Sequence, residues 1–553
     1  MWGVRACAFC CETLRTRNHI VYEDAKVIAM LDHNPRAKKH ILVIPHEHIP
    51  SVDDLTPTHY DLLHAKSLSD LLEGEFSRCL LTNYMYDLPW LFAECPRLTE
   101  VPVLLVHGER DRQGYDVAYI PLKCQLMKLM NVLLILCRYR MTKECREYSN
   151  VTPVVPPLPI PYGTHHTKML VALYSEKVRV AIFTANFLSN DWNSKTQGLW
   201  YQDFGLKVLA DSEDEEEETV SGSSSDFEVD LVHYLSSLGA PVKLFCAELK
   251  RFDFSTARVA LVPSVPGVHK GKGEEEALSS IIIRLLMLTF ENLYLLNRYG
   301  EIRASPRTQA SCSLLKMYKI PPTDNPLICQ FSSLGSLDEK WLFGEFAESF
   351  LPGKKIISST SMPIQALHII WPSVEDVRNS LEGWNSGRSI PCPLKNMKPF
   401  LHKYLRKWKP PSELHRQNAM PHIKSYARFN PSDDGAGELA WAIVTSSNLS
   451  KAAWGTLQKN KTQLMIRSYE LGVMFLPPLL GRQRNGTPSR LVTIASKAAE
   501  HSDVAGSDTQ PTELLPLPYS FPLTTYNPKN DEPWVWDLVR ESPDIFGNAY
   551  IPH

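Results

Sequence analysis

The chain has 553 residues, of which 61 are acidic and 59 basic, and its formal net charge is −2. At about 150 residues per domain, that length leaves room for about two to four domains. The apolar share of 44% and the charged share of 22% exclude a largely disordered or fibrous protein. The near-neutral charge excludes a globally basic DNA-coating protein but allows a local basic groove, because net charge averages over the whole surface.

The twelve cysteines are scattered and mostly unpaired in spacing, and the N-terminus does not resemble a signal peptide. We therefore expect reduced thiols in a cytosolic or nuclear protein. The longest apolar stretches lie near residues 125–137 and 281–297, and charged side chains interrupt both. We expect no membrane-spanning helix, because a span needs about 20 mainly apolar residues.

Residues 1–73 are expected to form one unit. Residues 26–32 and 41–45 read as strands, and leucines from Leu62 to Leu72 predict a helix. A further strand is expected at 101–106, followed by an ordered segment and a proline-rich loop within 125–160. Residues 211–226, which begin with an acidic run, predict an exposed loop, as do residues 267–280 and 482–512.

The most informative feature is an internal repeat. One copy places His166 and Lys168 before an apolar strand, which is followed by Asn186 and, six residues later, by Trp192. The second copy repeats this order with its own His, Lys, Asn and Trp, and its first histidine lies 256 residues after His166. The second set comprises His422, Lys424, Asn448 and Trp454. Two units of the same plan predict a pseudo-twofold protein with two α/β halves.

The repeat predicts phosphodiester chemistry. Residues i and i+2 of an extended segment point to the same face, so His-x-Lys presents an imidazole beside an ammonium. Two ammoniums and two amides can hold the non-bridging oxygens of a phosphodiester. One imidazole can attack phosphorus and form a phosphohistidine, while the other protonates the leaving oxygen and later activates water. The lysines supply positive charge, so the sequence implies neither a cofactor nor a catalytic metal.

These motifs resemble those of the phospholipase D superfamily, and the sequence around them is more similar to the tyrosyl-DNA phosphodiesterase family. The matching segments begin with Tyr162–Met169, Asp191–Gly198 and Gln330–Ser336 and continue with Pro372–Arg378, Asn418–Lys424, Asn448–Gly455 and Gln463–Gly472. The superfamily's usual Asp after His-x-Lys-x4 is replaced by Leu173 and Phe429, as in this family, which argues against lipid cleavage. The resemblance runs from about residue 95 to the C-terminus.

The resemblance implies a role for each matching residue. His166 would attack the 3′-phosphorus of DNA and displace tyrosine, and His422 would act as general acid and then base. Lys168, Lys424, Asn186 and Asn448 would bind the phosphoryl oxygens, and Gln197 and Glu470 would support the histidines. Tyr162 would stack on a base, the serines would contact the DNA backbone and Trp536 would lie near the peptide. These serines are Ser332, Ser333 and Ser450.

Residues 1–72 resemble the first half of a histidine-triad (HIT) nucleotide-binding domain, on the words Cys7–Cys10, Val21–Asp24, Asp32–Pro35 and His40–Ile49. The resemblance implies that Cys7, Cys10 and His48 are three of the four ligands that a structural zinc site needs. No His-x-His-x-His follows in residues 73–150, so we expect no nucleotide hydrolase activity. A truncated HIT-like domain would either pack on the rest of the chain or mark a fusion of neighbouring coding regions.

The sequence thus predicts two phospholipase-D-like α-β-α sandwich domains, residues 74–257 and 258–553, behind an α+β HIT-like fragment at 1–73. The family implies a monomeric nuclear enzyme acting on single-stranded, nicked or double-stranded DNA 3′ ends that bear a tyrosyl peptide of topoisomerase I. Residues 125–160 and 277–312 fit the family pattern poorly. The same chemistry is also expected on other 3′ adducts. The alternatives are an inactive or DNA-end-binding fusion protein and a HIT-type nucleotide hydrolase.

Overall fold

The computed structural model describes residues 20–23, 27–31, 41–45, 66–108, 141–207, 225–270, 325–350, 363–414, 416–430, 438–460, 463–480, 489–493 and 512–552. The chain divides into two compact units, Met1–Lys66 and Ser67–His553. The predicted acidic loop and most of the two poorly matching segments lie outside the described residues, and so do Cys7, Cys10 and His48.

The first unit contains a three-stranded antiparallel sheet in the order β1-β2-β3. Its strands are Ile20–Glu23, Val27–Leu31 and Ile41–Pro45. The strands predicted at residues 26–32 and 41–45 are therefore confirmed.

The second unit begins with helix α3 (Leu68–Leu71). Ser67 caps the N-terminus of this helix, because its hydroxyl accepts a hydrogen bond from the Asp70 amide. Leu68 and Leu71 are buried in the same core as Phe76. The predicted boundary at residue 73 therefore differs from the structure, because this short helix belongs to the core of the second unit.

The first lobe of this unit is built on a six-stranded sheet in the order β6-β5-β4-β7-β8-β9. Neighbours β6, β5 and β4 are parallel, and β4, β7, β8 and β9 pair antiparallel. In chain order the strands are β4 (Arg78–Asn83), β5 (Val103–His107), β6 (Val151–Val154), β7 (Met169–Leu173), β8 (Lys177–Phe183) and β9 (Leu199–Gly205).

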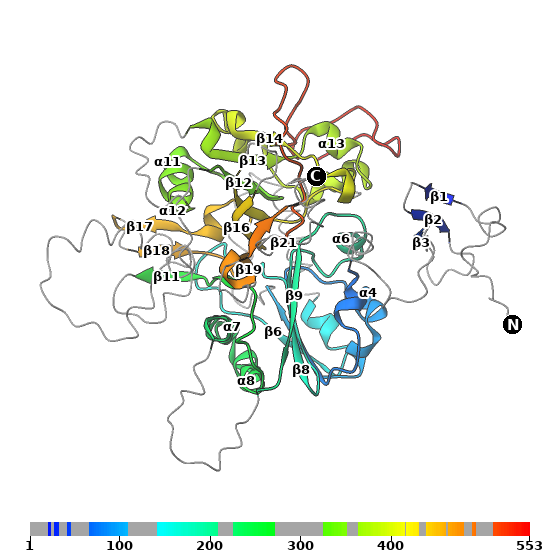
Figure 1. Ribbon diagram of the computed structural model, residues 1–553, viewed down its shortest axis with the longest axis vertical. Helices are drawn as coiled ribbons and strands as arrows, with labels where there is room; N and C mark the ends of the chain where they lie inside the picture. The colour runs from blue at the N-terminus through cyan, green and yellow to red at the C-terminus, as the bar shows by residue number, and fades with distance from the viewer. Residues whose placement is uncertain are drawn as a thin grey trace, which may run out of the picture. The chain divides into compact units, whose positions relative to one another are not determined.

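Helices cover both faces of this sheet (Figure 1). Successive residues of a strand point to opposite faces. Leu81 and Leu105 pack in one core with α3 and α4 (Leu88–Glu94), whereas Leu80 and Leu104 pack in another with α7 and α8. Helix α7 spans Asp226–Ser237 and α8 spans Ala240–Leu249. The α-β-α sandwich predicted for this half is confirmed.

The second lobe is built on a nine-stranded sheet whose main path is β10-β19-β16-β15-β12-β13-β14, with β20 and β21 joined through β16. All of its strands follow residue 259. They are β10 (Ala260–Ser264), β12 (Leu327–Gln330), β13 (Leu367–Trp371), β14 (Leu405–Lys407), β15 (Ser425–Asn430), β16 (Glu438–Thr445), β19 (Glu470–Phe475), β20 (Arg490–Val492) and β21 (Thr512–Leu514).

Short helices and a small sheet complete this lobe. The sheet β11-β18-β17 comprises Gly267–Lys270, Gln463–Ile466 and Thr456–Gln458. A π-helical turn at Leu342–Ala347 joins α11 to α12. The helices are α6 of the first lobe (Ser189–Asn193), α11 (Glu339–Trp341), α12 (Glu348–Phe350), α13 (Val374–Arg378), α14 (Lys451–Trp454) and α15 (Pro477–Leu480).

The two lobes share a core. Val444 and Val473 of the second sheet pack with Phe245 of α8 and Val180 of β8 in one hydrophobic cluster. Gly198 lies at the closest approach, where an added Cβ would be 2.5 Å from Val444 Cγ1 and 2.9 Å from Ile423 Cδ1. The lobes therefore meet along packed apolar surface next to the two motifs.

No helix among the described residues is long and apolar enough to cross a membrane.

Candidate active site

Each His-x-Lys motif lies in an extended segment that leads directly into a strand. Lys168 immediately precedes β7, and Lys424 immediately precedes β15. The Phe183 amide donates to the Lys168 carbonyl and the Thr445 amide to the Lys424 carbonyl. Each motif therefore lies beside the strand that leads to the Asn of its own repeat.

The two motifs are also held by backbone contacts that cross between the lobes. The His166 amide donates to the Tyr469 carbonyl at 2.9 Å, and the His422 amide donates to the Thr196 carbonyl at 2.9 Å. Isolated parallel bridges join His165 to Tyr469 and Thr196 to Pro421. Each histidine is thus fixed by the lobe to which it does not belong, which is the arrangement that a pseudo-twofold axis produces.

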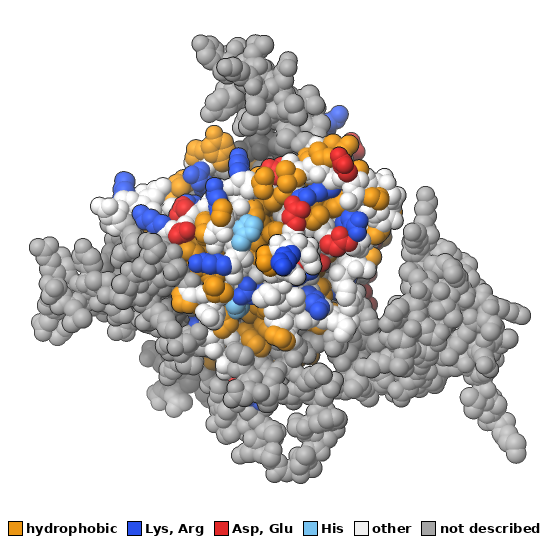
Figure 2. Space-filling model, turned by 90° about the horizontal axis from the view of Figure 1, so that it is seen from above, with side chains coloured by type: hydrophobic (Ala, Val, Ile, Leu, Met, Phe, Trp, Pro, Cys, Tyr) orange, Lys and Arg blue, Asp and Glu red, His pale blue; other side chains and the backbone are white. Residues whose placement is uncertain are grey.

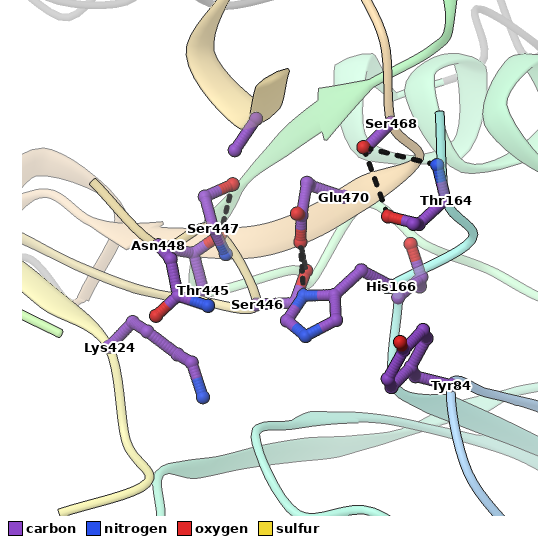
Figure 3. Close-up of polar contacts among 12 residues, drawn as sticks. Tyr84, Thr164, His166, Lys424, Thr445, Ser446, Ser447, Asn448, Ser468 and Glu470 are labelled. Carbon is purple, nitrogen blue, oxygen red and sulfur yellow. Dashed lines mark hydrogen bonds and ion pairs between the residues drawn. The ribbon is translucent and has the colours of Figure 1, made fainter. Parts of the chain in front are cut away.

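His166 has a carboxylate partner. Its Nδ1 lies 2.9 Å from Glu470 Oε2, at the first residue of β19, and both side chains are largely buried. The same Glu470 oxygen accepts a hydrogen bond from the Ser446 hydroxyl. Figure 3 shows the His166, Lys424 and Asn448 side chains directed toward a common space, with Glu470 behind the imidazole. A carboxylate on Nδ1 favours the tautomer in which Nε2 carries the free electron pair.

His422 has a different surrounding. Its Nδ1 lies 3.3 Å from Gln197 Oε1 and 3.5 Å from Asp191 Oδ2. The Thr184 hydroxyl donates to Gln197 Oε1 at 2.7 Å, which holds this oxygen in place. A neutral amide and a more distant carboxylate therefore support His422, whereas Glu470 pairs with His166 directly.

Both lysines are buried, with 0% of their surface exposed. The Lys168 ammonium donates to the His166 carbonyl at 2.8 Å, and the Lys424 ammonium donates in the same way to the His422 carbonyl. Between His166 and Lys168, the Thr167 hydroxyl bonds to Tyr234 of α7. Side chains alternate along the extended segment, so Thr167 points into the core while His166 and Lys168 point to the opposite face.

The two asparagines lie just beyond the ends of β8 in the first lobe and β16 in the second. Asn186 donates its amide and its Nδ2 to Asp191 Oδ2, at 2.8 and 2.9 Å, and its Oδ1 is buried without a hydrogen-bond partner among the described residues. Asn448 Oδ1 accepts the Ser332 amide at 3.2 Å, which leaves Nδ2 for another acceptor. The repeat therefore provides two side-chain amides beside two ammoniums.

Burial dominates the electrostatics of the site. Burial lowers the pKa of Lys168 to about 8, despite opposition from Glu470. Burial and the nearby Lys168 ammonium lower the pKa of Lys424 well below its usual range. Burial likewise lowers the pKa of His422, helped by Lys424 and opposed by Asp191. A bound anion would offset this concentration of positive charge, so the site favours a phosphate group.

Aromatic side chains lie beside the motifs. The Tyr84 ring, at the end of β4, packs edge-on against the His166 ring with centroids 5.3 Å apart, and Lys168 Nζ lies 5.7 Å from the same ring. Tyr162 is 91% exposed and has a φ of 61°, a left-handed conformation that is unusual outside glycine. Its ring therefore lies outside the protein core.

The remaining predicted contacts differ in exposure. Ser332 is buried, whereas Ser333 and Ser450 are partly exposed. The Ser450 hydroxyl accepts the Ala453 amide and thus caps α14. Trp536 is partly buried against the core of the second lobe. The substrate roles of these residues are predictions.

Three functional candidates had no role from sequence reasoning. Tyr84 lacks a repeat partner, and Ser446 lies inside the second strand motif without a distinctive spacing. Asp191 belongs to a segment that matched the family pattern, but only the fold shows its contact with His422. The contact between Asp191 and His422 joins the two lobes, so local sequence spacing does not reveal it.

Comparison with known proteins agrees with this geometry. A family model described as tyrosyl-DNA phosphodiesterase matches residues 50–527. Tyrosyl-DNA phosphodiesterase 1 of Arabidopsis thaliana is 38% identical over 513 residues, which cover 88% of this chain and 73% of the relative. A crystal structure of the yeast tyrosyl-DNA phosphodiesterase shares the fold at a TM-score of 0.54 and 18% identity, covering 85% of this chain and 95% of that one.

The N-terminal unit has separate relatives. A family model described as scavenger mRNA decapping enzyme C-term binding matches residues 6–70. The Arabidopsis thaliana protein named bifunctional adenosine 5'-phosphosulfate phosphorylase/adenylylsulfatase HINT4 is 47% identical over 57 residues, or 10% of this chain and 39% of that protein. The predicted HIT-like fragment is confirmed at the level of this similarity.

Proposed function

The chain belongs to the tyrosyl-DNA phosphodiesterase family, and from this we propose that it hydrolyses the bond between a DNA 3′-phosphate and a tyrosine, as in the remnant of a trapped topoisomerase I. The observation that carries the proposal is the pair of His-x-Lys motifs, each fixed by the opposite lobe in one buried, positively charged site. Such a site suits a phosphodiester anion.

The proposed reaction has two steps. Nε2 of neutral His166 attacks phosphorus, a phosphorus–nitrogen bond forms, and the bond from phosphorus to the tyrosyl oxygen breaks. Protonated His422 donates its proton to that oxygen, so tyrosine leaves neutral. Neutral His422 then takes a proton from water, the resulting hydroxide attacks phosphorus, and His166 is released together with a DNA 3′-phosphate.

The surrounding groups stabilise the charge that develops. Lys168, Lys424, Asn186 and Asn448 would contact the non-bridging oxygens, which carry more charge in the transition state than in the substrate. Glu470 orients the nucleophile by its hydrogen bond at Nδ1. These groups provide the charge and the proton transfers themselves, so we expect turnover without an added metal.

The DNA side of the substrate would lie over the exposed surface near Tyr162. Figure 2 shows a face of the molecule on which Lys and Arg side chains are interspersed with apolar and acidic ones. Positive charge beside apolar side chains suits the phosphates and bases of single-stranded DNA. Ser332, Ser333 and Ser450 would contact phosphates, and Trp536 would lie toward the peptide. A substrate of this kind places the enzyme in the nucleus, and we expect it to act as a monomer.

The test is cleavage of an oligonucleotide bearing a 3′-phosphotyrosyl group by the full chain, in buffer containing EDTA. The expected product is a 3′-phosphate end, with a 5′-phosphotyrosyl oligonucleotide as the control for polarity. If folded protein binds the 3′ substrate without cleaving it, the chain is a DNA-end-binding protein and the proposed function is wrong.

A further inference from the structure

Asp191 is a buried carboxylate in contact with the site that the reaction outlined above does not use. It is 2% exposed and belongs to α6, five residues after Asn186. Its Oδ1 lies 2.6 Å from the Lys195 ammonium, and that lysine is equally buried. The pair fills the space directly behind His422, because Asp191 Oδ2 lies 3.5 Å from His422 Nδ1.

Asp191 contacts both first-lobe amides that lie near His422. Its Oδ2 accepts both the amide and Nδ2 of Asn186. Its backbone carbonyl accepts Gln197 Nε2 at 3.0 Å, which turns Gln197 Oε1 toward His422 Nδ1. The Asn186 side chain cannot turn over, since its Oδ1 would then face the carboxylate oxygen. One side chain therefore fixes two amides and faces the imidazole.

The charges around His422 are unequal. Three lysines from three segments disfavour a positive charge on His422, namely Lys424, Lys168 and Lys195, whereas Asp191 favours that charge. Glu382 of the second lobe lies 4.0 Å from Lys195 and is a second acidic group beside this lysine. Gln197, the other partner of Nδ1, is neutral. The leaving-group step needs a protonated His422, and Asp191 supplies negative charge for that state.

We infer that Asp191, held by Lys195, is a positioning residue that keeps His422 in its proton-donating form during departure of the tyrosyl oxygen. This inference rests on the proposed function. It assigns the two histidines different partners for different tasks: Glu470 orients the neutral nucleophile His166, and the Asp191–Lys195 pair sets the protonation of the acid His422. Lys195 partly neutralises the negative charge of Asp191. Removing Lys195 should therefore act in the opposite direction to removing Asp191.

The test compares Lys195→Met with the double variant Lys195→Met/Asp191→Asn, which differ only in the charge at position 191. Single-turnover rates on the 3′-phosphotyrosyl oligonucleotide are measured from pH 5 to 9. In the pH–rate profile, the fall in rate at high pH should begin about one pH unit lower for the double variant than for Lys195→Met. The reason is that a nearby opposite charge, here Asp191 beside His422, shifts a pKa by roughly one to three units. For Lys195→Met alone, this fall should begin at a higher pH than for the wild type.

A second substrate separates proton donation from general damage. The second substrate is the same oligonucleotide with a 4-nitrophenyl ester on its 3′-phosphate. Nitrophenol is a more acidic leaving group than tyrosine, so it departs with less help from an acid. Loss of Asp191 should slow the tyrosyl substrate by about 10- to 100-fold, the usual effect of removing a group that orients a reacting residue. The nitrophenyl substrate should be slowed several-fold less.

The outcomes are distinct. The role of Asp191 would be overturned if the pH–rate profiles of Lys195→Met and the double variant fell at the same high pH. It would also be overturned if loss of Asp191 slowed both substrates equally. If the folded wild type cleaves neither substrate, the proposed function fails and this inference fails with it. Because the double variant removes both charges of the buried pair, neither Asp191 nor Lys195 is left as an unpaired buried ion.

Discussion

Glu470 and His166 form a hydrogen-bonded pair at 2.9 Å although 304 residues separate them in the sequence. The pair joins β19 of the second lobe to the segment before β7 of the first. Its counterpart, between Gln197 and His422, spans 225 residues in the reverse direction. The site is therefore assembled by exchange of supporting residues between the lobes, and neither lobe contains a complete half of it.

Substitution of each histidine should block a different step. His166→Ala should form no covalent adduct with a 3′-phosphotyrosyl oligonucleotide, because it lacks the nucleophile. His422→Asn should accumulate a His166–DNA adduct, because it lacks the base that activates water, and turnover should fall by about 10²- to 10⁴-fold. Denaturing gel electrophoresis with labelled DNA distinguishes these species. Wild-type turnover by His166→Ala would refute the nucleophile assignment.

Glu470→Gln should reduce turnover by about 10- to 100-fold, since a neutral amide holds the His166 tautomer less firmly than a carboxylate. Steady-state cleavage of the same oligonucleotide measures the loss. Glu438→Gln is the matched control, because Glu438 pairs with Arg490 of β20 rather than with a histidine. Equal loss in the two variants would contradict the role of Glu470.

Gly198→Ala should lower both thermal stability and turnover. The added Cβ would meet Val444 Cγ1 at 2.5 Å, and forcing extra volume into a packed core costs about 1–3 kcal/mol. Gly205→Ala is the control, since a Cβ at that position has no neighbour within 4 Å. Calorimetry and the cleavage assay provide the two readouts. If Gly198→Ala is as stable and active as Gly205→Ala, the close approach of the lobes is wrong.

The protein should lose stability as the pH falls below 6.5, in part through His165. Burial lowers the pKa of this histidine from 6.5 to about 3. Between these values the unfolded chain binds the proton and the folded chain does not, so His165 disfavours folding by about 1.4 kcal/mol per pH unit as the pH decreases. His165→Phe should therefore flatten the dependence of Tm on pH, while the exposed His402→Gln should not. An unchanged slope in His165→Phe would contradict the prediction.

Removal of the N-terminal unit should leave the active site intact, provided that the cut precedes α3. A chain beginning at Lys66 should retain wild-type turnover. A chain beginning at Gly74 loses the buried Leu68 and Leu71, which together contribute about 3 kcal/mol or more. Urea denaturation and the cleavage assay compare the two chains. Equal stability of both would show that α3 does not support the core.

The sequence alone determined the repeated motif, its chemistry and its family. His-x-Lys, the following apolar strand and the Asn are fixed by local spacing, so alternation along an extended chain was enough to predict which groups act together. The strands at 26–32 and 41–45 were also predictable, because each is a short apolar run. The unit boundary was placed too late, because the two leucines of α3 fit either unit by pattern and only packing assigns them.

The tertiary structure decided which residue supports which histidine. Family resemblance indicated Gln197 and Glu470 as supporting residues, but it did not reveal Asp191 behind His422 or Tyr84 against His166. It also decided that both lysines are fully buried, which lowers the pKa of Lys168 to about 8. Burial and long-range pairing depend on how the two lobes pack, and local spacing carries no record of contacts between residues hundreds of positions apart.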